Sequence, residues 1–572
     1  MATLADNFSR FGLSLPKRSG TGYMGNSMKT AKGRKQRPKK KLVPGETELR
    51  LGISGPGSKS SPIPTSGPEL IIALTGAVGT DIDRIVETIT AELAGFSYRA
   101  QTIHLIEELH QIKRWSALGD ETIDERYTSH MDAGNEFRKL LGRRDAMALL
   151  ATSYISKLRA QATGDSNVPS PRSVYILRSV KKPAEINTLR RIYGDNLFVL
   201  GIYAPEDSRI DDLAKKIASS HGAAQSKMFE PQATELVQRD QEETNNEYGQ
   251  NVRGAFPLAD FFIDVSDAAK ITVHIQRVLN LIFGTSIETP TRDEYGMFLA
   301  HAAGLRSASL GRQVGCCICA DDGAVMAVGC NEVPKAGGGL YWTGDQGDQR
   351  DHIVGVDSND QIKRQLLQDV LGRIKDAGWL IEEKSLSTDV ELLNEALQSD
   401  QIRDAKLMDI IDYGRAVHAE MSALIDAARH GMAVRDCTLY ATTFPCHNCA
   451  KHLLAAGIKR VVYVEAYAKS FVSELFSDSV AIDQPHPAEG MIQFQPFVGV
   501  SPRKYLSVFS MGELIRKKEG KVFVKQKNAS TPRFATPAHA YLVSEKQQIS
   551  VFRELLQEKG LEVEDEYEWA NK

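Results

Sequence analysis

The sequence predicts an α/β protein in which two units of alternating strands and helices follow one another. Short apolar runs typical of buried strands alternate with segments whose apolar residues recur every three or four positions, as in amphipathic helices. One such alternation begins near Glu69 and a second near Thr289. The composition agrees, because 42% of the 572 residues are hydrophobic and 25% are charged, as in ordinary globular proteins. No apolar run reaches the roughly 20 residues that span a bilayer, so we expect a cytoplasmic protein without membrane contact.

Residues 1–66 differ in composition from the rest of the chain. Residues 1–50 hold 12 Lys and Arg against 3 Asp and Glu, whereas the whole chain has a net charge of −3. Eight basic residues fall within Lys29–Lys41. Such a charged segment, rich in Gly, Ser and Pro, is expected to be a disordered arm and linker. It either contacts nucleic-acid phosphates or is a solvated tail without a partner, and the sequence leaves both interpretations open.

The first unit is predicted to span residues 67–286 and to contain a parallel sheet. Its first strand is expected at Leu70–Thr75, and the amphipathic helix after it at Ile82–Leu93. Further strands are expected at Ser173–Leu177, Leu197–Tyr203 and Ala259–Val265, with a helix at Pro183–Tyr193. Strands that alternate with helices are typical of parallel α/β sheets.

The turn between the first strand and its helix is where a phosphate-binding loop would lie. Its candidate residues are Gly76, Gly79 and Thr80. Residues 81–83, however, are Asp, Ile and Asp where the pattern needs Gly, Lys and Ser or Thr. The side chains that hold the β- and γ-phosphates and Mg²⁺ are therefore missing, and we expect no kinase activity. The backbone N–H groups of Gly79 and Thr80 could still meet a phosphate in a nucleotide sensor, or the domain is a purely structural partner.

The second unit is predicted to span residues 287–485, with an insertion at 336–415 and an extension at 486–572. An Asp-Gly turn between two apolar runs predicts a β-hairpin. The expected elements are strands at Gly315–Cys319, Ala324–Cys330, Thr438–Thr442 and Arg460–Glu465, and helices at Val417–Arg429 and from Cys446 to about Ala456.

Four residues of this unit suggest a catalytic metal site. His418, Cys446 and Cys449 supply three ligands of the kind that zinc prefers, and catalytic zinc sites keep the fourth position for water. Both cysteines fall at the start of one predicted helix, where the helix dipole favours thiolate. Glu420 is expected to touch the water and to move its protons. The alternative is a closed structural zinc site, with His447 as the fourth ligand.

The His-x-Glu and Pro-Cys-x-x-Cys pattern is the signature of zinc deaminases, and the chain resembles the deoxycytidylate deaminase family. The resemblance includes Ser307–Gly315 and Asn331–Pro334. It implies that zinc-activated water attacks C4 of cytosine while Glu420 carries protons to N3 and to the leaving ammonia. It further implies that Asn331 holds the deoxyribose and that Arg312 and Ser307 lie near phosphate. Lys469, in the familiar segment Tyr467–Ser470, is a further candidate for substrate binding.

The two-part layout resembles the antiphage deoxycytidine-nucleotide deaminases of bacteria. That resemblance implies a kinase-like P-loop domain followed by a cytidine deaminase-like domain of three α/β/α layers. It also implies homo-oligomers, depletion of dCTP during infection and, in some members, an inhibitory partner RNA.

Deamination of free dCTP or dCMP to dUTP or dUMP is therefore the leading hypothesis. Two alternatives remain. The first is a deaminase acting on cytosine or adenine within RNA or single-stranded DNA, and the second is an RNA-binding regulatory protein whose zinc is only structural.

Overall fold

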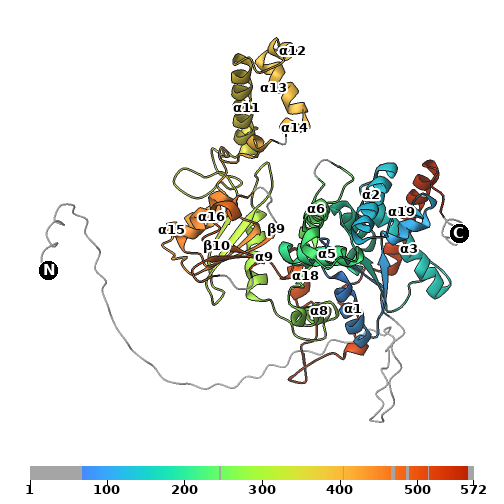
Figure 1. Ribbon diagram of the computed structural model, residues 1–572. Helices are drawn as coiled ribbons and strands as arrows, with labels where there is room; N and C mark the ends of the chain where they lie inside the picture. The colour runs from blue at the N-terminus through green and yellow to red at the C-terminus, as the bar shows by residue number, and fades with distance from the viewer. Residues whose placement is uncertain are drawn as a thin grey trace, which may run out of the picture. The chain divides into compact units, whose positions relative to one another are not determined.

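In the computed structural model, the chain forms two six-stranded β-sheets that are accompanied by helices (Figure 1). This confirms the predicted α/β fold class. The structure describes residues 67–243, 246–403, 405–465, 470–484, 488–512 and 514–563. The basic arm therefore lies outside the described residues. The described residues belong to one compact unit. None of their helices is long and apolar enough to cross a membrane.

The first sheet has the strand order β12-β5-β4-β1-β3-β2, and its pairs are parallel except for β12 with β5. Its strands are β1 (Leu70–Gly76), β2 (Arg99–His104), β3 (Ser173–Arg178), β4 (Leu197–Tyr203), β5 (Phe261–Asp264) and β12 (Gly499–Val500). The accompanying helices are α1 (Ile82–Gly95), α2 (Ile123–Leu141), α3 (Ala146–Thr163), α4 (Pro183–Tyr193), α5 (Glu206–Ser220), α6 (Glu230–Gln241), α7 (Val252–Ala255) and α8 (Ala268–Phe283). Strands β1, β3, β4 and β5 and helices α1 and α4 match the sequence predictions to within about three residues at each end.

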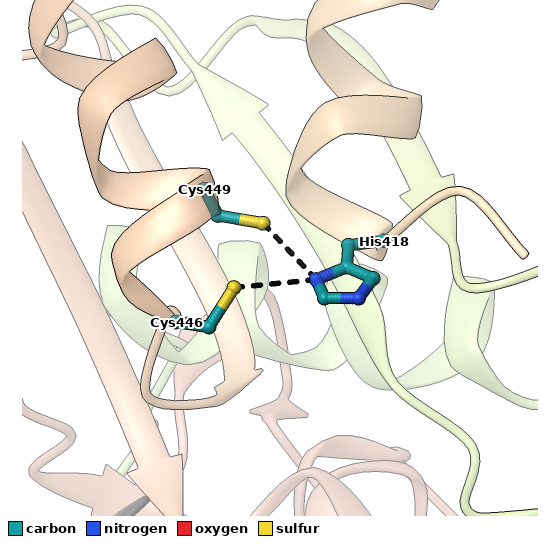
Figure 2. Close-up of side chains that lie close together, drawn as sticks. All are labelled: His418, Cys446 and Cys449. Atoms are coloured by element: carbon teal, nitrogen blue, oxygen red, sulfur yellow. Dashed lines mark hydrogen bonds between the residues drawn. The ribbon is translucent and has the colours of Figure 1, made fainter. Parts of the chain in front are cut away.

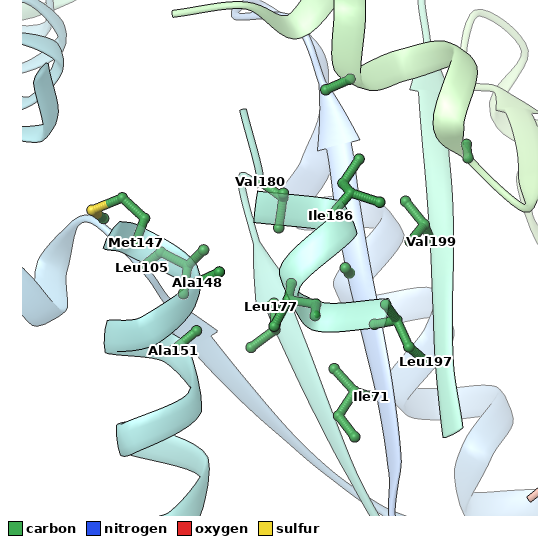
Figure 3. Close-up of a cluster of buried hydrophobic side chains, with 14 of the residues drawn as sticks. Ile71, Leu105, Met147, Ala148, Ala151, Leu177, Val180, Ile186, Leu197 and Val199 are labelled. Atoms are coloured by element: carbon green, nitrogen blue, oxygen red, sulfur yellow. The ribbon is translucent and has the colours of Figure 1, made fainter. Parts of the chain in front are cut away.

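Both faces of this sheet are covered, because successive side chains of a strand point to opposite sides. Ile71 and Ala73 belong to a core cluster with residues of α3 and α4, part of which Figure 3 shows. Ile72 and Leu74 belong to a second cluster, with residues of α1 and α8. A strand that is buried on both faces is a continuous apolar run, and this explains why β1 could be recognised in the sequence.

The second sheet has the order β10-β11-β9-β8-β6-β7, with β6 antiparallel to β7 and β8 and the other pairs parallel. Its strands are β6 (Gly315–Cys319), β7 (Val325–Cys330), β8 (Thr438–Thr443), β9 (Arg460–Glu465), β10 (Val480–Ile482) and β11 (Ile492–Pro496). The helices on it are α9 (Arg292–Gly304), α15 (Ala419–Arg429) and α16 (His447–Ala456). The Asp-Gly hairpin is present as β6 and β7, as predicted.

Helices lie on both faces of the second sheet, which gives three layers. Met297 and Ala300 of α9 share a cluster with Cys317 and Cys319. On the other face, residues of α15 and α16 share a cluster with Cys316 and Ile318. The two cysteines at the start of α16, which belong to the site described below, therefore lie on the face of the second sheet opposite α9.

The insertion at 336–415 contains helices that the sequence patterns did not reveal. They are α10 (Asp351–Val354), α11 (Ser358–Asp376), α12 (Glu382–Ser385), α13 (Asp389–Gln398) and α14 (Asp400–Arg403). Helix α11 packs on α13, with few fully buried side chains such as Leu367 and Leu392. Weak amphipathic patterning is what such a thin pair of helices produces, because little of each surface is removed from water.

The C-terminal segment contacts both sheets. Its elements are α17 (Val472–Leu475), α18 (Pro502–Phe509), α19 (Ala538–Glu558) and a small hairpin of β13 (Lys517–Lys518) and β14 (Lys521–Val522). Strand β11 pairs with β9, whereas β12 extends the first sheet. Helix α19 packs on α3 and α4, where Arg159 is buried between Glu69 and Glu545. The segment expected as an extension of the second unit thus also completes the first.

Candidate metal centre and catalytic cavity

Three side chains that are far apart in the sequence converge at the starts of two helices (Figure 2). The Sγ atoms of Cys446 and Cys449 lie 3.3 Å and 3.4 Å from Nδ1 of His418. The ligand atoms of the three residues all lie within 4.8 Å of one another. The cysteines are buried and His418 is half-buried. The structure therefore brings together the predicted ligand set.

Local chain geometry explains this convergence. His418 is the N-cap residue of α15, and Cys446 is the N-cap residue of α16. Cys449 lies three positions after Cys446, so both sulfurs emerge from the same face of the first helical turn. Backbone hydrogen bonds between Val417 and Glu332, 3.0 Å and 3.3 Å long, hold the approach to His418 against the chain that follows β7.

The donor set fits a zinc ion. Zinc bonds of about 2.3 Å to sulfur and about 2.0 Å to nitrogen at tetrahedral angles place S and N roughly 3.5 Å apart, close to the separations found here. The hydrogen bond with Cys449 lowers the pKa of the Cys446 thiol, and the neighbouring His418 acts in the same direction. A thiolate is the form that binds metal.

His447 does not join this group. Among the described residues, the group of possible metal ligands consists of the two cysteines and His418. The His447 ring packs edge-on against Phe471, with 5.7 Å between ring centroids. The alternative in which His447 closes the coordination shell is therefore not supported by the placement of its side chain.

Glu420 lies directly beside the three ligands. Its Oε2 atom is 3.5 Å from Sγ of Cys449, and the residue is 4% exposed. Burial raises the pKa of its carboxyl group. A raised pKa makes the carboxylate a better proton acceptor than an exposed glutamate, which is the property that the predicted role requires.

The side chains open onto a cavity of about 230 Å³. Its lining includes His418, Glu420 and Cys446 together with Asn331 and Arg312. Further lining residues are Ser309, Gly311, Val314, Ile411, Ala419, Thr443 and Phe444. The candidate substrate residue Asn331 and the candidate metal ligands thus face one space, although almost 90 residues separate Asn331 from His418.

Asn331 also shapes the wall of this cavity. Its Oδ1 accepts a hydrogen bond from the Val314 N–H at 2.7 Å, and its Nδ2 donates to the Arg312 carbonyl at 2.8 Å. Arg312 lies 3.4 Å from Glu465 at the end of β9 and is about half exposed. Ser307 is buried behind the wall and donates to the Asn331 carbonyl at 2.6 Å. Of these three candidates, Asn331 and Arg312 line the cavity, whereas Ser307 supports it.

A comparison of the sequence with protein families matches residues 290–465 to the cytidine and deoxycytidylate deaminase zinc-binding region. This segment contains the three ligands, Glu420, Asn331 and Arg312. Residues 290–465 are thus similar to this family, and we refer to them as the deaminase domain.

Proteins similar in sequence to the chain include deoxycytidylate deaminases. The deoxycytidylate deaminase of Enterobacteria phage T2 is 44% identical over 54 residues, which are 9% of this chain and 29% of that protein. ComE operon protein 2 of Bacillus subtilis is 36% identical over 72 residues, 12% of this chain and 38% of that protein. The chain therefore spans well under half the length of these relatives. The dCMP deaminase of cyanophage S-TIM5, solved with dCMP and dUMP, aligns over 37% of this chain and 99% of its own, with 16% identity and a TM-score of 0.21.

The structure places two further groups of residues in the cavity lining that the sequence analysis missed. Phe444 and Thr443 line the cavity directly before the Cys446 motif, so their position was a usable signal. Ile411 comes from the end of the insertion, and no sequence pattern marked it. Lys469, predicted to bind substrate, lies outside the described residues.

The predicted phosphate loop lies between β1 and α1, apart from the deaminase cavity lining. Gly79 has φ +88°, and an added Cβ would lie 2.5 Å from the Arg209 carbonyl oxygen, so this position needs glycine. The Thr80 N–H donates to the Ala77 carbonyl at 3.2 Å. Gly76 is the last residue of β1, and its carbonyl accepts a hydrogen bond from Lys181 Nζ at 2.9 Å.

A carboxylate of the chain itself occupies this loop. Asp240 of α6 is fully buried, and its Oδ2 accepts a hydrogen bond from the Val78 N–H at 2.7 Å. Lys181 Nζ donates to the same oxygen at 2.8 Å. A backbone N–H and a lysine are the groups that hold a phosphate in functional loops. Asp240 was not foreseen, because 162 positions separate it from Val78.

Proposed function

We propose that the deaminase domain hydrolyses free deoxycytidine nucleotides, converting dCMP or dCTP and water to dUMP or dUTP and ammonia. The observation that carries this proposal is that Glu420 and two of the three candidate ligands, His418 and Cys446, line the same small cavity as Asn331 and Arg312, with Cys449 next to both ligands. The matching domain family and the deoxycytidylate deaminases among its relatives support this substrate class.

His418, Cys446 and Cys449 would hold the zinc ion, whose contribution is to lower the pKa of water toward neutrality. Glu420 accepts a proton from the water that adds to C4 of cytosine and gives it to N3. It then takes the proton of the new C4 hydroxyl group and transfers it to the exocyclic amino group, so that the C4–N bond breaks, ammonia leaves and a uracil carbonyl forms. The buried carboxyl group of Glu420, with its raised pKa, suits this exchange in both directions.

Substrate orientation falls to the cavity wall. Asn331 is held by two backbone hydrogen bonds, which fixes its side chain next to the metal ligands. Phe444 offers an apolar aromatic surface to the base, and its ring is itself held by Tyr463 at 4.9 Å between centroids. Arg312 is the cation of the lining and the natural contact for phosphate. We further propose that this reaction lowers dCTP during phage infection.

The deciding experiment is a substrate panel of dCMP, dCTP, CMP, CTP and single-stranded DNA, with ammonia and the uracil product measured. We expect turnover of the deoxynucleotides, about one zinc per chain, and turnover that is lower by about 10²–10⁴ in Glu420→Gln. Glu383→Gln, at an exposed position of α12 in the insertion, is the matched control and should keep full activity. Turnover of DNA alone would replace the free-nucleotide proposal by polynucleotide editing. Full activity of Glu420→Gln would refute the catalytic assignment.

A further inference from the structure

A second cavity, larger than the catalytic one, lies beside the first sheet. Its volume is about 590 Å³, and the described residues that bound it come from the end of α8, from α18 and from positions 510–512, 514, 525 and 531–534. None of its lining residues belongs to the catalytic cavity. This size lies within the range of about 300–1,000 Å³ found for sites that hold small molecules. We call it the Lys525 cavity.

Two cations line the Lys525 cavity, and neither has a carboxylate partner among the described residues. Within the part of the chain that the structure describes, Lys525 has neither a hydrogen bond nor an ion pair, although it is only partly exposed. Arg533 donates to the Val508 and Ser510 carbonyl oxygens at 2.7 Å and 2.6 Å and forms no ion pair with a described residue. No described lining residue is acidic. Partly buried cations are normally paired, so this arrangement leaves positive charge for an anion.

Neighbouring cations increase this local excess of positive charge. Burial and the charge of Arg172 lower the pKa of Lys525. Burial and the charge of Arg516 lower the pKa of Arg533. Each shift means that the charged form is less stable here than in water. An anion bound between the two side chains would relieve both effects.

The remaining lining combines hydroxyl groups with apolar surface. Ser507, Ser510 and Thr531 contribute the hydroxyl groups. The Phe283 and Phe534 side chains form part of the wall, where Leu506 and Met511 are 67% and 47% exposed to solvent. Exposed apolar side chains next to a few convergent polar groups are typical of a ligand site rather than of ordinary surface.

We propose that the Lys525 cavity binds a small phosphate-bearing molecule with an apolar ring, the chemistry of a nucleotide. The two cations and three hydroxyl groups suit a phosphate chain, and the aromatic and aliphatic wall suits a base. A small ligand suits this concave site better than a nucleic acid strand. The exposed lysines that could follow a strand, which are Lys517, Lys518 and Lys521, lie on the β13–β14 hairpin outside the lining. The wall helix α18 also touches the deaminase domain, where Tyr505 stacks on Phe298 with centroids 4.2 Å apart.

Calorimetric titration of the zinc-loaded full chain with ATP and with pyrophosphate tests this site. ATP serves as a probe because it carries a phosphate chain and a base but no cytosine. We expect saturable binding of one ATP per chain, and pyrophosphate should compete with it. Lys525→Gln should weaken ATP binding about tenfold, the loss of one charge-assisted hydrogen bond. Lys525→Arg should restore most of it.

Two matched controls locate the site. Lys521→Gln removes an equally charged but exposed side chain of the hairpin, and Thr80→Ala alters the loop after β1. Both should leave the ATP affinity within about twofold of wild type. The Lys521 side chain is an exposed charge, which contributes little, and Thr80 lies outside the lining of the Lys525 cavity. All variants should keep the zinc content and melting temperature of the wild type.

Four outcomes would overturn the proposal. Equal losses in Lys521→Gln and Lys525→Gln would indicate diffuse attraction to a basic surface, and tighter salt-sensitive binding of single-stranded RNA through the hairpin lysines would indicate a nucleic-acid surface. A loss in Thr80→Ala alone would place ATP at the loop. Absence of saturable binding of either probe up to about 5 mM, a free energy weaker than roughly −3.1 kcal/mol, would show that the cavity takes no such ligand. The deaminase assay is independent of all four results.

Discussion

The deaminase cavity and the loop after β1 share a strand–turn–helix construction, but the first is open whereas a side chain of the protein fills the second. In both, a buried strand leads through a short turn into a helix, which points backbone N–H groups and the positive end of the helix dipole outward. After β8, this junction presents Cys446 to an open cavity, with Cys449 directly behind it in the first turn of α16. After β1, the Asp240 carboxylate takes the Val78 N–H and Lys181. The difference teaches that a strand–turn–helix junction becomes a binding site only where no side chain of the protein satisfies it first.

Among the tests of this comparison, removing a metal ligand should have the largest effect on zinc content and activity. In Cys449→Ala, a two-ligand site remains, so we expect loss of zinc from about one per chain to near zero and loss of all deaminase activity. Metal analysis by mass spectrometry and the ammonia assay measure both. Cys437→Ala is a suitable control, because Cys437 is a buried cysteine outside the ligand group. A zinc-replete Cys449→Ala protein would contradict the assigned site.

Glu420→Gln should separate chemistry from metal binding. The amide cannot exchange protons, so kcat should fall by about 10²–10⁴, while zinc content and melting temperature stay unchanged. This result would show that the cavity is catalytic rather than merely open. A protein that loses zinc along with activity would instead make Glu420 a structural support for the ligands.

The loop after β1 should respond in stability rather than in activity. Asp240→Ala leaves the Lys181 ammonium and the Val78 N–H without their buried acceptor, so we expect a loss of about 3 kcal/mol in the free energy of unfolding. Urea unfolding of the variant and the wild type measures it. Adding Lys181→Met should recover much of the loss, because the second unpaired group is then removed as well. A change below about 0.5 kcal/mol would mean that Asp240 does not fill the loop in the way described.

Arg312→Gln should have the smallest effect among these changes. If Arg312 contacts phosphate, KM for the nucleotide should rise about tenfold with a smaller change in kcat, since uniform binding is lost. The effect should be larger for dCTP and dCMP than for deoxycytidine, which has no phosphate. Steady-state kinetics with the three compounds checks this order. Equal effects on all three would assign Arg312 to the Glu465 ion pair and the shape of the wall.

The predictable parts of the fold share one property, which is a strong local pattern. Strands β1, β3, β4 and β9 are continuous apolar runs, and the Asp-Gly turn marks the β6–β7 hairpin, so short windows of sequence sufficed. Strand β2 was missed because five of its six residues are not buried and its residues are mostly polar. The two-residue strand β12 joins the first sheet after a long passage through the second, and no local pattern can announce such pairing.

The candidate site divides in the same way. Four of its residues were predictable because metal binding and proton transfer need particular side chains at short spacings. Two short motifs meet this need, one with His418 and Glu420 and one with Cys446 and Cys449. What the tertiary structure alone decided is which distant residues meet them. Ile411 reaches the catalytic cavity, Asp240 fills the loop, and Lys525 and Arg533 share a cavity whose described lining residues include no carboxylate. Such placements, of which the contact between Val78 and Asp240 across 162 positions is the longest, depend on how whole elements pack. Packing energy is spread over many side chains rather than encoded in any one segment.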